Sequence, residues 1–248
     1  GGKEQIAGEY QPGWMLLSYG KKVSVSSSLE GYPAENIVDE DARTAWVAQS
    51  NRDMEWAQVD LQRLSSIHAI QVNFDEYGAN QKGAVSGVYQ SYLIYASVNG
   101  EDWSLVVDYG TKKTDTPHDY IEFEEPFKAR YIKLQNKEYT VSENFSVRDL
   151  RIFGKGQGST PRAVNDFTVE RDEADPCKAR LCWEAVPDAQ GYIVRYGIAG
   201  DKLYNNFQVM GENTLEIGSL NKGVAYYFTI DAYNENGITR TSRIKVCR

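Results

Sequence analysis

The sequence predicts an all-β chain with two domains, and three observations support this prediction. Apolar and polar residues alternate with a period of two in many short segments, as in strands that bury one face. The chain has 17 tyrosines, and aromatic residues make up 12% of it, a composition that suits half-buried pleated surfaces. A glycine-rich stretch, GKGQGSTP at 154–161, divides the 248 residues into two parts of ordinary domain size.

Alternating segments follow one another through the first part of the chain. The hairpin signal Asn99-Gly100 directly follows one of them. Only residues 33–38 suggest a helical turn. Short strands at this spacing predict a sandwich or barrel. The segments are Val23 and Val25, Ile70 to Phe74, Tyr92 to Val98, Ile121 and Phe123, Ile132 and Leu134, and Leu150 and Ile152.

The part after the glycine-rich stretch is also strand-rich. Residues 178–186 and 191–197 read as strands, and Tyr226, Phe228, Ile230 and Ala232 alternate strictly. Leu220 precedes Tyr226 by six residues, a spacing at which a tyrosine hydroxyl can bond back to the main chain at a sandwich corner. The sequence therefore divides into a leader (1–17), a first domain (18–155), a linker (156–163) and a second domain (164–248).

Charge and hydropathy exclude two classes of partner. The net charge is 27 − 35 = −8, and neither part carries the basic stripe that a phosphate backbone requires. No apolar run approaches the roughly 18 residues of a membrane helix. We therefore expect neither nucleic acid nor membrane as a partner.

The second domain resembles the fibronectin type III family. The resemblance covers about 85 residues and implies an immunoglobulin-like β-sandwich, most often used as a spacer. The sequence has no Arg-Gly-Asp tripeptide, so it does not imply the integrin-binding loop of some members. The residues that match the family pattern are Trp183, Tyr192 to Tyr196, Leu220, Gly223, Tyr226, Phe228, Ile230, Ala232, Asn234 and Gly237.

The first domain resembles the discoidin, or coagulation factor 5/8 type C, family, to which the jelly roll of family 32 carbohydrate-binding modules is related. The resemblance implies a galactose-binding-domain-like jelly roll over about 135 residues. Five motifs carry it in the right order: PAENIVDEDARTAW at 33–46, WAQVDL at 56–61, SVNGEDW at 97–103, RYIKL at 130–134 and DLRIFG at 149–154.

Residues 9–20 (EYQPGWMLLSYG), with this order of modules, resemble the tail of bacterial family 43 glycoside hydrolases of the β-xylosidase and α-arabinofuranosidase type. The resemblance implies an upstream catalytic domain as partner and a secreted, periplasmic or cell-surface location. Gly1-Gly2-Lys3 is not a secretion signal, and we expect the chain to be a piece of a longer protein. We predict a non-catalytic module that binds a plant-type polysaccharide or glycan. The alternatives are packing against a catalytic domain and adhesion to a protein or cell surface.

The discoidin resemblance implies a structural calcium ion. Its ligands would be the Ala34 and Asp41 carbonyls, the Asp39 side chain, the Thr44 hydroxyl and carbonyl, and an acid from the last strand, Asp149. Calcium takes 6–8 oxygen ligands, which a tight acidic turn can supply. Glu40 replaces the family's glycine, so the turn is strained if it needs a positive φ. The alternative is an Asx-turn whose acids cap backbone amides.

The same resemblance places the sugar site on loops at one end of the jelly roll. A sugar needs an aromatic plate surrounded by polar groups. The matching stretches here are 46–55, 74–90 and 135–146, and they do not identify the sugar. We assign Trp46, Trp56 and Trp103 to the core. The candidate ligand-binding residues are Arg52, Tyr77, Asn80, Lys82, Tyr89, Tyr139 and Asn144.

Three further groups give weaker signals. Cys177, Cys182 and Cys247 are either small buried side chains or include one disulfide, Cys177–Cys247, which needs an oxidising compartment. His68 alternates within a strand and is interpreted as structural. Glu124 and Glu125 are adjacent, so they point to opposite sides of a strand and cannot flank one glycosidic bond. We therefore expect no catalytic site in this chain.

Overall fold

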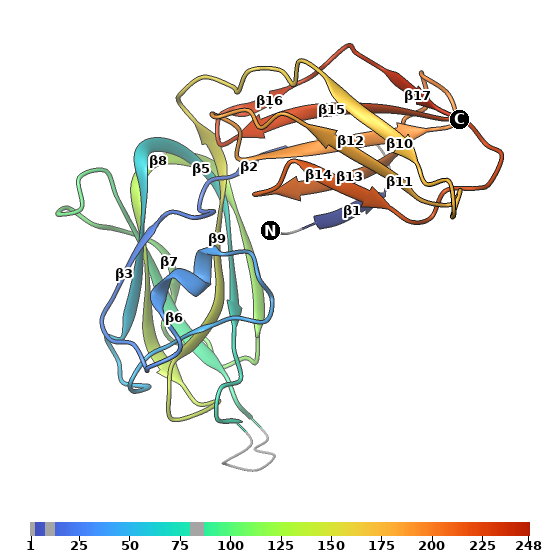
Figure 1. The fold of residues 1–248 in the computed structure, drawn as a ribbon. Coiled ribbons are helices and arrows are strands. Elements are labelled where there is room, and N and C mark those ends of the chain that lie inside the picture. The colour runs from blue at the N-terminus through green and yellow to red at the C-terminus, as the bar shows by residue number, and fades with distance from the viewer. Residues whose placement is uncertain (1–2, 8–12, 80–86) are drawn as a thin grey trace. The chain divides into compact units, whose positions relative to one another are not determined.

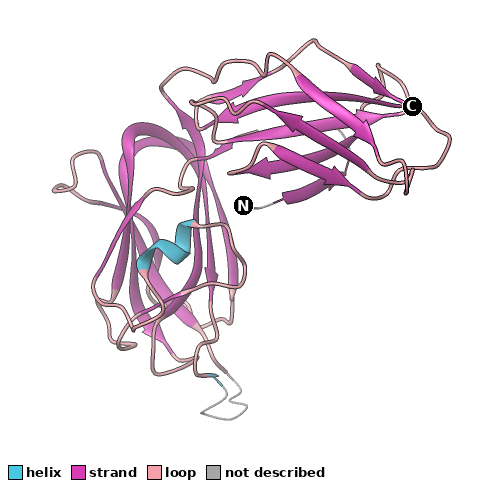
Figure 2. Ribbon diagram, viewed as in Figure 1, coloured by secondary structure: helices cyan, strands magenta, loops and turns pink. Residues whose placement is uncertain are grey.

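A computed structural model describes residues 3–7, 13–79 and 87–248 and confirms the all-β prediction. Figure 2 shows strands and loops almost throughout, with the 3-10 turn η1 (Ala34–Val38) as the clearest helical segment. The described residues form two compact units, one from residue 16 to 157 and one from residue 158 to 248 together with residues 3–7 and 13–15 (Figure 1). Within the described ranges, no helix is long and apolar enough to cross a membrane.

The first unit is built on one eight-stranded sheet with the strand order β2-β9-β5-β8-β6-β7, to which β3 adds on β5 and β4 on β9. Neighbouring strands are antiparallel, which suits the short alternating segments of the sequence. The strands are β2 (Met15–Leu16), β3 (Lys22–Val25), β4 (Trp46–Val47), β5 (Trp56–Phe74), β6 (Gln90–Ser97), β7 (Ser104–Tyr109), β8 (His118–Tyr139) and β9 (Ser146–Gly156).

The two longest strands, β5 and β8, let this sheet fold over on itself into a jelly roll. Their register shifts between Asp60 and Ser65, where Gln62 has a φ of 67°. Such an irregularity bends a strand and increases its twist. The first half of β5 therefore pairs with β3 and the end of β8, and its second half pairs with β9 and the start of β8. The inner face encloses a core that includes Trp46, Ile70 and Tyr92.

Two of the three tryptophans that the sequence assigns to the core lie elsewhere. Trp46 is fully buried, but Trp56 and Trp103 are only half-buried and lie outside the core cluster. The reason is the alternation of β5, which turns Ala57 and Val59 inward and so directs Trp56 to the opposite face. The assignment of Trp56 and Trp103 to the core is therefore wrong.

The second unit packs two sheets face to face. A three-stranded sheet has the order β10-β11-β14, and a six-stranded sheet has the order β1-β13-β12-β15-β16, with β17 on β15. Apolar side chains from both sheets form one core, including Leu181, Val194 and Phe228. The strands are β1 (Lys3–Ala7), β10 (Phe167–Arg171), β11 (Ala179–Trp183), β12 (Gly191–Gly197), β13 (Asn205–Met210), β14 (Thr214–Ile217), β15 (Tyr226–Asn234), β16 (Gly237–Thr239) and β17 (Lys245–Cys247).

The tyrosine corner that the sequence predicts is confirmed. The Asn221 N–H donates to the Tyr226 hydroxyl at 2.9 Å, which ties the start of β15 to the preceding turn. The Leu220 N–H donates to the Cys177 carbonyl at 2.9 Å, so this turn is also held to the loop before β11. These two bonds fix the corner of the sandwich.

The structure differs from the predicted leader at residues 1–17. Lys3–Ala7 pairs antiparallel with β13, from Lys3 opposite Val209 to Ala7 opposite Asn205, and thereby belongs to the second unit. Main-chain hydrogen bonds at a sheet edge can be made by almost any extended segment. For this reason no side-chain pattern in KEQIA predicted the pairing.

The three cysteines are free thiols, so the Cys177–Cys247 disulfide is not formed in this structure. Cys247 is buried in β17, and burial raises the pKa of its thiol. Cys177 and Cys182 are half-buried. The interpretation as small packed side chains fits Cys247 best.

Candidate functional site

The predicted ligand loops meet at one end of the first unit and are tied together by asparagine side chains. The Asn51 amide donates to the carbonyls of Tyr139 and Ser142, at 3.2 and 2.9 Å. The Asn136 amide donates in return to the carbonyls of Asn51 and Arg52, both at 2.9 Å. Two of the three predicted loops, 46–55 and 135–146, therefore form one connected scaffold.

Tyr139 is part of the core and is not a ligand plate. Its side chain is 2% exposed, its ring packs against Phe74 and Phe145, and its hydroxyl donates to the Asp75 carbonyl. Burial raises the pKa of this phenol. The prediction that Tyr139 contacts ligand is therefore wrong. β8 continues to Tyr139 and directs its ring inward, which the loop-like composition around it does not indicate.

Asn144 and Arg52 have different roles in the same loops. The Asn144 amide donates to the Ala48 carbonyl at 2.8 Å and so holds the loops together. The Arg52 side chain is exposed, while its backbone N–H donates to the Ser50 hydroxyl at 3.2 Å. Of these two predicted residues, only Arg52 presents its side chain to solvent.

Tyr77 forms an aromatic pair that the sequence does not predict. Its ring lies edge-on to Tyr32, with 4.9 Å between ring centroids, and both side chains are half-buried. A Cβ placed on the next residue, Gly78, would lie 3.9 Å from the Ser142 Cβ, so the pair is beside the connected loops. The sequence gives no signal for Tyr32 beyond its position in the loop after β3.

A buried carboxylate shapes the loop that carries Arg52. Glu55 accepts hydrogen bonds from the hydroxyls of Ser26, Ser27 and Ser50 at 2.7–2.8 Å, and from the Ser50 N–H at 3.2 Å. Burial opposes ionisation of Glu55, but these hydrogen bonds outweigh it and lower the pKa of the carboxyl. No pattern in the sequence singles out Glu55, which looks like an ordinary surface acid before a strand.

Tyr89 lies directly before β6 and contacts the end of β8. Its hydroxyl donates to Glu138 at 2.6 Å, and its N–H donates to the Thr140 hydroxyl at 2.8 Å. The hydrogen bond to Glu138 raises the pKa of Tyr89. The Lys113 ammonium lies 5.7 Å from the ring centroid, so one side of this ring is partly covered. Two further predicted residues, Asn80 and Lys82, fall outside the described residues.

The acidic turn after η1 brings three oxygen-bearing groups together. The Thr44 hydroxyl lies 2.6 Å from an Asp39 carboxylate oxygen and 3.1 Å from the Asp41 carbonyl. The other Asp39 oxygen accepts the Asp41 N–H at 2.9 Å, as in an Asx-turn. The Asp41 carboxylate pairs instead with Arg43, whose hydrogen bond lowers the pKa of Asp41. Glu40 has a φ of 55°, the strained conformation that a glycine would adopt freely.

Asp149 on β9 lies near this turn and is buried. The pKa of its carboxyl is raised, because burial and the nearby charges of Glu40 and Asp39 disfavour ionisation. A hydrogen bond from Asn73 at 2.9 Å opposes this shift without cancelling it. Glu40 itself is paired with Arg151 at 2.7 Å. Within the described ranges, no three Asp, Glu, His or Cys side chains converge as metal ligands. A cation here would therefore need the Thr44 hydroxyl and backbone carbonyls.

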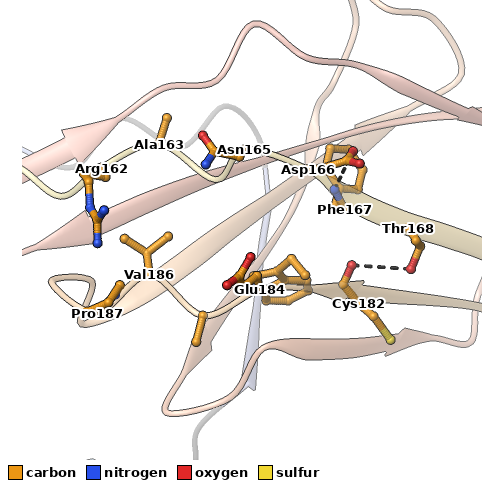
Figure 3. Close-up of a pocket in the computed structure, with 12 residues that line it drawn as sticks. Arg162, Ala163, Asn165, Asp166, Phe167, Thr168, Cys182, Glu184, Val186 and Pro187 are labelled. Atoms are coloured by element: carbon orange, nitrogen blue, oxygen red, sulfur yellow. Dashed lines mark hydrogen bonds between the residues drawn. The ribbon is translucent and has the colours of Figure 1, made fainter.

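A separate cavity of about 550 Å³ opens in the second unit, between residues 162–168 and 182–187 (Figure 3). Asp166 at its rim forms ion pairs with Arg243 and Lys245. The Trp183 indole nitrogen is covered by neighbouring atoms and has no hydrogen-bond partner among the residues that the structure describes. None of the predicted site residues lines this cavity.

Residues 22–150 match the sequence model of the F5/8 type C domain. Rat (Rattus norvegicus) lactadherin is 33% identical over 110 residues, which are 42% of this chain and 25% of lactadherin. Mouse (Mus musculus) lactadherin is 32% identical over 110 residues. The chain thus spans about a quarter of the length of the curated relatives it matches.

Solved structures of carbohydrate-binding modules are also similar. Chitosan-binding module 2, in complex with chitotriose, of a chitosanase/glucanase from Paenibacillus sp. IK-5 is 20% identical, with a TM-score of 0.48, and covers 56% of this chain and 99% of that module. The family 32 module of C. perfringens NanJ, in complex with galactose, is 18% identical, with a TM-score of 0.46, and covers 56% and 98%.

Proposed function

Because the chain belongs to the F5/8 type C domain family through residues 22–150, we propose that its first unit is a non-catalytic carbohydrate-binding module. The observation that carries this proposal is the half-exposed pair of Tyr32 and Tyr77 beside the tied loops. A tyrosine ring is rigid and amphipathic, so it can stack on the C–H face of a sugar with little loss of conformational freedom.

The loop 46–55 offers polar groups that are suited to hydroxyl recognition. Arg52 and Gln49 are exposed on this loop, which is held by Glu55 and Asn136. A loop fixed by internal hydrogen bonds loses little entropy when a ligand binds. The module would thus hold a sugar between an aromatic plate and a fixed set of donors and acceptors.

The remaining parts of the functional assignment are proposals about the longer protein. We propose that the second unit, whose sequence resembles fibronectin type III domains, acts as a spacer. We also propose that the parent protein is a secreted, periplasmic or cell-surface glycoside hydrolase, which this module directs to polysaccharide or glycan. Packing against an upstream catalytic domain remains the alternative, and binding data separate the two.

We further propose a structural calcium ion at the turn after η1. The proposal is supported by the Thr44 hydroxyl, which lies within hydrogen-bond distance of both the Asp39 carboxylate and the Asp41 carbonyl. Asp149 adds a buried carboxylate whose charged form is disfavoured without a cation. The Ala34 and Thr44 carbonyls would complete the ligand set, and the ion would hold the turn against β9.

A glycan array tests the carbohydrate-binding proposal directly. The complete chain should bind a subset of plant-type or other glycans, and Tyr77→Ala should weaken that binding by about 2 kcal/mol or more if its ring is the plate. Tyr120→Ala is the matched control, since Tyr120 is an exposed tyrosine of β8 that lies outside the loops. No binding to any glycan would contradict the proposal and favour the packing role.

A further inference from the structure

The outward side of the sheet in the first unit carries a second group of aromatic residues, outside the core cluster and distinct from the Tyr32–Tyr77 pair. Here the register aligns three rows of side chains across β3, β5, β8 and β6. We refer to these outward residues as the aromatic face. The rows are Lys22, Asp60, Tyr131 and Ser97; Ser24, Gln58, Lys133 and Tyr95; and Trp56, Gln135 and Leu93.

Four aromatic rings lie on or beside this face, and all are half-buried. Trp56 is at one corner, and Tyr95, Tyr131 and Trp103 gather at the other. The Trp103 and Tyr131 rings are in edge contact, with 6.4 Å between centroids. Apolar rings that face solvent are unfavourable. Four such rings on one face therefore indicate that this face binds a partner in the working protein.

The chemistry at the centre of the face is cationic. The Lys133 ammonium lies 4.5 Å from the Trp103 ring centroid and 5.4 Å from that of Tyr95. Arg130 is paired with Asp60 at 2.9 Å and Lys137 with Asp53 at 2.9 Å, whereas Lys133 has no carboxylate partner in the described part of the chain. An unpaired cation is thus held among rings in a chain whose net charge is −8.

We propose that the aromatic face binds a glycan chain that carries carboxylates, as a site additional to the loops. The C–H faces of the sugar rings would stack on Trp56 and on the Tyr131 corner. A carboxylate would pair with Lys133, and the half-buried Gln58 amide would meet a hydroxyl. Gln135 and Tyr131 are four residues apart on β8, about 13 Å along a strand, so the face suits several sugar units rather than one.

Charge complementarity selects this occupant over a neutral chain or an apolar protein surface. None of the residues in the three rows is a strongly exposed apolar side chain, and those in the described strands of this unit, Leu64, Leu105 and Tyr120, lie outside the rows. The middle row instead places Gln58, Lys133 and Tyr95 side by side. An amide and an ammonium between aromatic rings match the alternating hydroxyl, carboxylate and C–H surfaces of an acidic polysaccharide.

Calorimetric titration with oligogalacturonate, and with its fully methyl-esterified form, tests this proposal on the complete chain. Oligogalacturonate should bind, and the ester, which has the same rings without charge, should bind about tenfold more weakly or worse. Lys133→Met should weaken oligogalacturonate binding by about tenfold and remove its salt dependence. Lys155→Met, an exposed lysine of β9, is the charge-matched control and should bind as the wild type does.

Trp56→Ala should weaken the binding of both probes, because stacking does not depend on charge. A thermal melt of this variant shows whether its fold is kept. Binding at the loops instead would be lost in Tyr77→Ala, which distinguishes this site from the proposed loop site. The proposal is overturned if the wild type does not bind oligogalacturonate, if Lys133→Met binds it normally, or if Tyr77→Ala removes the binding.

Discussion

Asp231 on β15 is fully buried, and its carboxylate accepts a hydrogen bond from Arg195 of β12 at 2.8 Å. Arg240 also reaches it at 2.8 Å, and the Thr241 N–H donates at 3.0 Å. One carboxylate therefore joins β12, β15 and the segment after β16. Removing one member of such a buried ion-paired network leaves the other members without a partner, which destabilises the fold.

Asp231→Ala should therefore destabilise the second unit by about 1–3 kcal/mol, because Arg195 and the Thr241 N–H would lose their acceptor. Urea denaturation followed by fluorescence measures the change. Asp166→Ala is the control, since this exposed carboxylate also faces two cations, Arg243 and Lys245, but in solvent. The control should leave the denaturation midpoint almost unchanged, and equal effects of the two variants would contradict the argument.

Trp46 and Trp56 should respond very differently to truncation. Trp46→Ala removes a fully buried ring from the core and should cost about 3–5 kcal/mol. Trp56→Ala removes a half-buried ring from the outward face and should cost clearly less. Thermal melts of the two variants give the comparison. Equal losses would place Trp56 in the core after all.

These tryptophans also show how far the sequence predicts the fold. Alternation identified the strands of both units and the spacing of Leu220 and Tyr226 predicted the sandwich corner, because both signals are local. The face on which a strand residue lies depends on which neighbours are buried. The prediction for Trp56 failed because it was taken from the resemblance to the discoidin family, whereas Ala57 and Val59 are the inward residues here.

The candidate site was predictable only in outline. The order of motifs located the loops, but the roles of their residues depend on long-range contacts, such as the bond from Asn51 to Ser142. Tyr139 belongs to the core because β8 extends to it, and Tyr32 joins Tyr77 only through the fold. Edge pairing by Lys3–Ala7 uses backbone groups alone and leaves no side-chain signal.

Calcium should stabilise the first unit if it binds at the turn after η1. An ion that binds only the folded state adds about 2.7 kcal/mol at a hundredfold excess over its Kd, so chelation should lower the melting temperature. Asp39→Asn should melt as the chelated wild type does and should not respond to added calcium. Asp108→Asn, on exposed β7, is the control and should respond normally. An identical melt of the wild type with calcium and with chelator would contradict the proposal.

Glu55 should make the first unit sensitive to acid. Its hydrogen bonds from Ser26, Ser50 and Ser27 outweigh burial and lower the folded-state pKa, so its contribution to stability is complete above the unfolded value of about 4.3. The contribution is lost as the pH falls through the lowered folded-state pKa. At pH 7, Glu55→Gln should therefore cost roughly 1–3 kcal/mol, and the difference from the wild type should shrink as the pH is lowered below about 4. Melting temperatures of both proteins from pH 7 to pH 3 measure this, and a difference that stays constant with pH would show that Glu55 acts through its shape alone.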